Sequence, residues 1–85
     1  MSVKLLLLKS GEQVLADTKE LRRKDDVPMV DKVYGFLLTQ PHKVTANKPV
    51  VLTEDKVMTV PKEWVITIVN PIESIVKMYE EKIDG

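Results

Sequence analysis

The sequence predicts a mainly β protein, a small and strongly bent antiparallel barrel of five strands followed by a C-terminal amphipathic α-helix. Three observations lead to this prediction. Short runs rich in Val, Ile and Leu recur along residues 3–69 and are separated by turn residues, which is typical of short strands. Gly35 stands inside one run, where a small barrel has to bend. Residues 71–85 then change to the three- and four-residue apolar spacing of a helix.

The first two strands are expected to form a hairpin around a Ser-Gly turn. Residues 3–9 are an apolar run too short for a stable helix, and they predict a strand buried on both faces. Residues 13–21 then alternate, which places Val14 and Ala16 on one face and Leu15 on the other. This second strand is therefore expected to be half-buried.

A charged loop is expected over residues 22–26, because Pro28 prevents a helix from running through this segment. Residues 30–38 predict a third strand that bends at Gly35. Pro41 is expected to interrupt this strand, and residues 43–46 are expected to form its far end after the proline.

The next strands are separated by weaker signals. Residues 47–49 predict a turn. The apolar runs 50–53 and 57–60 flank three charged residues, so they form either one long interrupted strand or two short ones. Residues 61–64 fit a single 3₁₀ turn, and residues 65–69, all Val, Ile or Thr, predict the last strand.

The C-terminal helix is expected from about Pro71 to Ile83. Asn70 can cap it, Pro71 suits its first position, and Glu73 has capping-box spacing from Asn70. Its apolar stripe must be buried on the end of the barrel or on a neighbouring subunit. The stripe comprises Ile72, Ile75, Val76, Tyr79 and Ile83.

Composition excludes several kinds of site. The 85 residues include no Cys, one His, and 13 basic against 13 acidic residues. Thiol chemistry and His- or Cys-based metal sites are therefore not expected, and a generally basic nucleic-acid binder is disfavoured. No Gly-rich phosphate loop and no Ser-His-Asp set can be proposed. We expect one domain, with the barrel in residues 1–69 and the helix in 70–85, and no cofactor.

Targeting signals are not expected. The apolar run Leu5–Leu8 is shorter than a secretory core, and no segment reaches the length of a membrane span. We therefore expect a cytoplasmic protein that does not bind membranes. A chain this short buries a small core, so association with copies of itself would stabilise it.

The N-terminal half resembles the Sm-like proteins, whose fold is an SH3-like barrel. The spacing of apolar residues and of the turn glycine is similar to that of the first Sm motif. The pattern is Leu5-x-Leu7-Leu8-Lys9-Ser10-Gly11-x-x-Val14-x-Ala16-x-Thr18. The overall run, which ends in residues 63–71 and a helix containing residues 79–82, is also similar to short proteins of marine phages and ocean metagenomes. A phage origin would place the protein in the host cytoplasm.

The resemblance implies a homo-oligomeric ring of about five to seven subunits, in which strand four of one subunit pairs with strand five of the next. It also implies binding of single-stranded RNA or DNA. The sequence departs from the family at Ala16, where glycine is usual, and at Arg22 and Asp26, which align with an Asp and an Asn. Lys62 lies where the second Sm motif has an Arg-Gly pair. The family's uridine-reading site is therefore not expected.

Charged residues supply the first candidate site. Arg22, Arg23 and Lys24 are three consecutive cations, and the resemblance places them in a loop at the pore of a ring, where they would contact phosphates. Lys62 would lie near the same rim and assist them. The alternative is a solvated turn whose charge residues 25–26 offset.

Aromatic residues supply a second candidate site. Tyr34 and Trp64 could stack on bases, as the aromatic residues of single-strand binders do. Trp64 is expected instead to fill the barrel core, where such a residue anchors the last strand. His42, beside Pro41, is a further stacking candidate that we expect on a surface loop, not as a catalytic base or metal ligand.

The sequence therefore predicts an Sm-like ring that binds single-stranded RNA or DNA and acts in nucleic-acid processing. The alternative is a non-catalytic structural or adaptor module, such as a phage virion component, that binds another protein through the barrel edge or the helix. An enzyme is not expected, because the residues that catalysis requires do not form a recognisable set.

Overall fold

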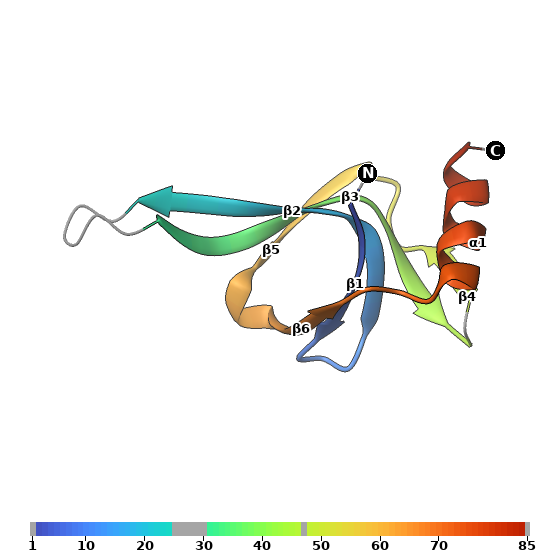
Figure 1. Cartoon of the computed structure of the whole chain (residues 1–85), viewed down its shortest axis with the longest axis horizontal. Coiled ribbons are helices and arrows are strands. Elements are labelled where there is room, and N and C mark those ends of the chain that lie inside the picture. Colours follow the sequence, from blue (N-terminus) through green and yellow to red (C-terminus); the bar gives the residue numbers. More distant parts are fainter. Residues whose placement is uncertain (1, 25–30, 47, 85) are drawn as a thin grey trace.

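The computed structural model describes residues 2–24, 31–46 and 48–84. Within these residues, six strands form one antiparallel sheet, and a single α-helix follows them (Figure 1). The mainly β class and the C-terminal helix are thus confirmed. The elements are β1 (Val3–Leu8), β2 (Gln13–Lys24), β3 (Asp31–Thr45), β4 (Lys48–Val51), β5 (Val57–Pro61), the 3₁₀ turn η1 (Lys62–Trp64), β6 (Val65–Val69) and α1 (Glu73–Asp84).

The strand order is β4-β3-β2-β1-β6, and β5 pairs with β3 beside β4. β3 is long enough for one edge to hold two strands, since its residues 42–45 pair with β4 and its residues 35–39 pair with β5. The two apolar runs before η1 are therefore separate strands, and the predicted count of five is wrong. No pairing joins β5 to β6 within the described residues, so the sheet is not closed and the predicted barrel is not confirmed.

Gly35 creates the predicted irregularity in β3. The β2–β3 register shifts here, because Leu21 pairs with Gly35 whereas Arg22 pairs with Val33. A Cβ atom on Gly35 would lie 2.8 Å from the carbonyl oxygen of Val60 in β5. Glycine therefore allows two backbones to approach more closely than any side chain would permit.

Two predicted breaks in the chain are strands instead. β3 continues through Pro41, which is tolerated because a second register shift and a positive φ of 51° at Gln40 relieve the ladder there. β2 extends through residues 22–24, which pair with residues 31–33, so the predicted charged loop is a strand there. Residues 25–30 lie outside the described part of the chain.

A similar correction applies to the predicted turn at residues 47–49. Lys48 and Pro49 begin β4, while Asn47 lies outside the described residues. Pro49 is tolerated here because β4 is an edge strand of the sheet.

The sheet has an apolar cluster on each face. The inner cluster comprises Leu6, Val14, Ala16, Phe36, Leu38 and Val60. The outer cluster comprises Leu15, Ile75 and Tyr79, and Val3, Leu5, Val44, Met78 and Ile83 pack against it. The predicted alternation of β2 is confirmed, because Val14 and Ala16 face one cluster and Leu15 the other.

The helix α1 packs on the outer cluster through Ile75 and Tyr79. Neither the barrel end nor a neighbouring subunit is needed to cover this part of its stripe. Ile72 precedes α1 and is 63% exposed. The predicted cap is not formed, since the side-chain oxygen of Asn70 accepts a hydrogen bond from Lys4 Nζ at 2.5 Å instead. Among the described helices, none is long and apolar enough to cross a membrane.

Candidate functional site

The β2–β3 pair projects beyond the rest of the sheet as a two-stranded arm (Figure 1). β5 supports β3 only along residues 35–39. Residues 22–24 of β2 pair with residues 31–33 of β3, and β5 does not reach this part of β3. We call residues 21–24 and 31–34 the arm. A two-stranded ribbon exposes both of its faces, so long charged side chains can cover it without being buried.

One face of the arm combines cations with an aromatic ring. Arg23 and Lys32 are directly opposite each other in the register. The guanidinium carbon of Arg23 lies 5.7 Å from the centroid of the Tyr34 ring, within the range of a cation–π contact. Tyr34 is 46% exposed, so its ring remains accessible beside the two cations.

Arg22 lies on the opposite face of the arm and is partly neutralised. Its guanidinium forms an ion pair with Glu20 at 2.5 Å, and both side chains are about half exposed. Lys24 ends β2, but its side chain lies outside the described part. The structure thus separates the predicted cluster, because neighbouring residues of a strand point to opposite faces.

Lys62 is exposed in η1, directly after Pro61. Pro61 pairs with Gly35, and Gly35 pairs with Leu21 on its other edge. Two strand spacings, or about 10 Å, therefore separate the backbones of Pro61 and Leu21. Pro61 is therefore level with Leu21, the first residue of the arm, and Lys62 is the next residue along the chain.

His42 does not belong to this surface. It is 5% exposed and lies edge-on against Tyr79, with the ring centroids 4.8 Å apart. This corrects the prediction of a surface loop residue, and it removes His42 as a stacking candidate. Burial lowers the pKa of His42, and the nearby charge of Lys82 lowers this pKa further. Its Nδ1 atom is buried without a hydrogen-bond partner among the described residues.

Tyr79 and Lys82 attach α1 to the sheet beside His42. The Tyr79 hydroxyl donates hydrogen bonds to the carbonyl oxygens of Thr39 and Gln40, at 3.1 Å each. Burial raises the pKa of Tyr79, so the hydroxyl stays protonated as this role requires. The ammonium group of Lys82 donates to the carbonyl oxygen of Pro49.

An apolar cleft with a volume of about 730 Å³ opens at the inner cluster. Its floor includes Val14, Leu38 and Val60, which belong to that cluster. The sequence did not predict this cleft, because alternation shows which residues face inward but not whether they fill the space there. The full lining comprises Leu8, Lys9, Ser10, Glu12, Val14, Leu38, Leu52, Thr53, Asp55, Met58, Val60 and Trp64.

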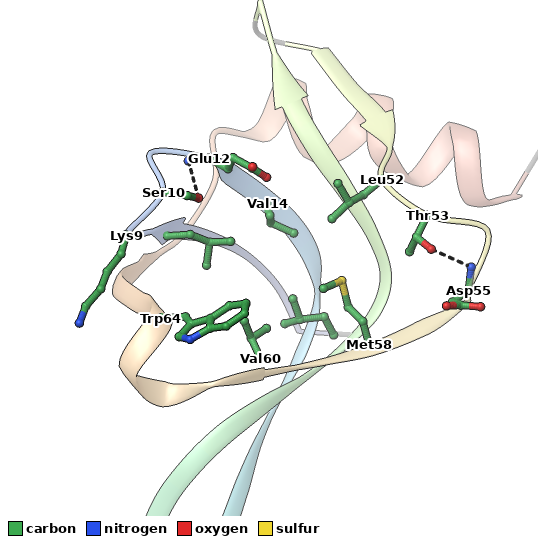
Figure 2. A pocket seen from close by; sticks show the side chains of 12 residues that line it. Lys9, Ser10, Glu12, Val14, Leu52, Thr53, Asp55, Met58, Val60 and Trp64 are labelled. Atoms are coloured by element: carbon green, nitrogen blue, oxygen red, sulfur yellow. Dashed lines mark hydrogen bonds between the residues drawn. The ribbon is translucent and has the colours of Figure 1, made fainter.

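Trp64 forms one wall of the cleft (Figure 2). It is 60% exposed, so the expectation that it fills the core is wrong. Its carbonyl oxygen accepts a hydrogen bond from the backbone N–H of Lys9 at 2.8 Å. This bond fixes η1 against the β1–β2 turn and leaves the ring at the mouth of the cleft.

Two loops carry carboxylates at the rim of the cleft. The backbone N–H of Asp55 donates to the hydroxyl of Thr53 at 3.2 Å, and the N–H of Glu12 makes a longer contact of 3.5 Å with the hydroxyl of Ser10. In Figure 2, Glu12 and Asp55 lie on different sides of the cleft, whereas the ammonium group of Lys9 points away from it. The rim is therefore negatively charged.

Among the described residues, no group of three or more His, Cys, Asp or Glu residues could hold a metal ion. No protein-family model matches the chain, and no curated protein is significantly similar to it. The interpretation of the arm and the cleft therefore depends on their geometry and charge.

Proposed function

We propose that this protein is a non-catalytic, Sm-like nucleic-acid-binding protein that holds single-stranded RNA or DNA on its arm. The supporting observation is that Arg23, Lys32 and Tyr34 share one exposed face. The two cations would contact phosphates, and a base would stack on the tyrosine ring. Because these contacts read no base edge, the proposal includes no sequence preference.

The charge arrangement of the arm supports this proposal. Arg23 and Lys32 are directly opposed in the register. A phosphate placed between them would contact both cations. Glu20 pairs with Arg22 on the opposite face, so Arg23 and Lys32 are the cations that accompany Tyr34.

The proposal includes a homo-oligomeric ring of about five to seven copies, each an open SH3-like barrel. Its support is that β5 and β6 each pair with one strand only within the described residues. β6 also exposes Ile66 and Val69, at 60% and 46%. Pairing β5 of one copy with β6 of the next would cover these edges and bring several arms together.

Fluorescence anisotropy with a labelled oligo(U) or oligo(dT) strand tests the nucleic-acid proposal. We expect binding at low salt that weakens steeply as salt is added, because binding to phosphates releases counterions. The double variant R23A/K32A should weaken binding and make the dependence of log affinity on log salt shallower by about two.

The matched control is K48A/K77A, which removes two exposed lysines from β4 and α1, at the other end of the molecule from the arm (Figure 1). This variant has the same net charge as R23A/K32A and should bind nearly as well as the original chain. Equal losses in the two variants would show a net-charge effect without an arm site. No binding at low salt would rule out the proposal.

The second candidate function is a structural or adaptor module that binds another protein. The apolar cleft favours it, because a cleft of about 730 Å³ with a mainly apolar lining and few polar groups has the size and chemistry of a binding site. The exposed apolar side chains of β6 and Ile72 would add contact area.

A further inference from the structure

The apolar cleft leaves part of the inner cluster open at one end. Three of its lining residues, Val14, Leu38 and Val60, belong to that cluster. Leu52 and Met58 pack against the same cluster from the side of the β4–β5 connection. An apolar group that entered here would therefore contact core residues and be removed from water.

Trp64 gives the cleft an aromatic wall. The hydrogen bond from the Lys9 N–H to the Trp64 carbonyl oxygen holds its backbone at the mouth of the cleft. An aromatic side chain with two rotatable bonds that is 60% exposed offers a large contact area at a small cost in conformational entropy. It can also receive a cation on its ring face.

The charge of the rim indicates what the occupant must carry. The ion pairs among the described residues involve neither Glu12 nor Asp55, and Figure 2 shows these two carboxylates on different sides of the cleft. Lys9, the remaining charged residue of the lining, points its ammonium group away. An occupant with one positive group could approach one carboxylate, whereas an extended segment with positive groups on both sides of an apolar residue could approach both.

We propose that the cleft binds an extended segment of a partner protein in which lysine or arginine residues flank an apolar residue. This inference rests on the second candidate function and names the chemistry of its partner. The apolar residue enters the cleft beside Trp64 and Met58, and the flanking cations face Glu12 and Asp55. The arm takes no part in this contact.

Three short peptides test the proposal. They are acetyl-KLFLK-amide, acetyl-ELFLE-amide and acetyl-KSGSK-amide, which combine apolar residues with cations, apolar residues with anions, and cations without apolar residues. Trp64 is the only tryptophan of the chain, so its fluorescence reports directly on the cleft. We expect a saturable blue shift with the first peptide and no saturable shift with the other two.

Paired variants locate the binding. E12Q/D55N should weaken the first peptide about three- to tenfold, the effect expected of two exposed ion pairs, and should let acetyl-ELFLE-amide bind about as well. The matched control E80Q/E81Q neutralises two exposed carboxylates of α1 and should change nothing. R23A/K32A should also bind the first peptide normally, which separates the cleft from the arm.

Each alternative outcome has a distinct meaning. Equal binding of the first two peptides to the original chain would overturn the charge inference while leaving an adaptor function in place. Absence of a saturable shift with every peptide would overturn the cleft as a docking site. An unchanged affinity in E12Q/D55N, with circular dichroism showing a folded chain, would also overturn the inference.

Discussion

Single residues determine how closely neighbouring strands of this small sheet can approach each other. Gly35 lies between β2 and β5, and its missing side chain leaves room for the Val60 carbonyl oxygen. Its place inside an apolar run predicted an irregularity there. The close contact itself involves two residues far apart in the sequence, so the sequence pattern could not identify the partner.

Replacement of Gly35 by Ala should therefore destabilise the fold. The new Cβ atom would meet backbone, which cannot rotate away as a side chain can, so β3 and β5 must separate. We expect the free energy of unfolding to fall by about 1–3 kcal/mol, as measured by urea denaturation. Lys43→Ala, at an exposed position of the same strand, should change it by less than about 0.5 kcal/mol. Equal stability of the two variants would show that the backbone around residue 35 can shift to accommodate a Cβ atom at little cost.

Trp64 and His42 show how exposure can depart from residue type. Trp64 is a large aromatic residue of the kind that usually fills a core, but its side chain is mostly exposed. The reason is that the 3₁₀ turn directs its ring across an open cleft. His42 follows a proline, a context typical of loops, but is buried against Tyr79 of α1. In both cases the decisive neighbour comes from a distant segment.

The secondary-structure elements differ in how well the sequence specified them. β1, β6, η1 and α1 have short, strong signals and lie within about two residues of the prediction. The end of β2 has three consecutive cations, whereas a half-buried strand would alternate apolar and polar residues. In a ribbon with both faces exposed, no alternation is needed, so the pattern resembles that of a loop.

The α1–β3 contact predicts a dependence of stability on pH. His42 has an ordinary pKa of about 6.5 when the chain is unfolded, and burial lowers that pKa in the folded state. Between the two pKa values the unfolded state binds more protons, so stability falls as the pH falls below about 6.5. Two groups around His42 belong to α1, Tyr79 and Lys82. Three more line the cavity beside it, Glu54, Asp55 and Lys56.

Urea denaturation at about pH 7.5 and about pH 5.5 measures this dependence, in the range where a histidine titrates. The variant H42F keeps an aromatic ring against Tyr79 but cannot take up a proton. We expect the original chain to lose stability at the lower pH and H42F to lose less. The same loss in both chains would mean that another group is responsible.

The size and shape of the complete fold favour association. The chain is short, its described strands leave unpaired edges at β5 and β6, and β6 exposes apolar side chains. Such edges promote pairing between chains unless they are covered. An oligomer would cover them and add the apolar burial that a small domain lacks.

Light scattering at micromolar concentration tests this association. We expect the original chain to have a mass several times that of the 9.7 kDa monomer. Ile66→Lys places a charge on β6 and should lower the mass toward that of a monomer. Ile72→Lys changes a residue of similar exposure that lies outside the sheet, and should leave the mass unchanged. A monomeric original chain would contradict the ring.

The amino-acid sequence was sufficient to predict the β class, the first hairpin, an irregularity at Gly35, the final strand and the C-terminal helix. These features depend on periodicity, turn residues and local backbone preference, which are properties of neighbouring residues. The tertiary structure decided the number of strands, the separation of Arg22 from Arg23, the burial of His42 and the opening of the cleft. Each of these features depends on which distant segments of the chain come into contact. The hydrophobic effect drives such contacts but has no preferred direction, so no short stretch of sequence specifies which segments meet.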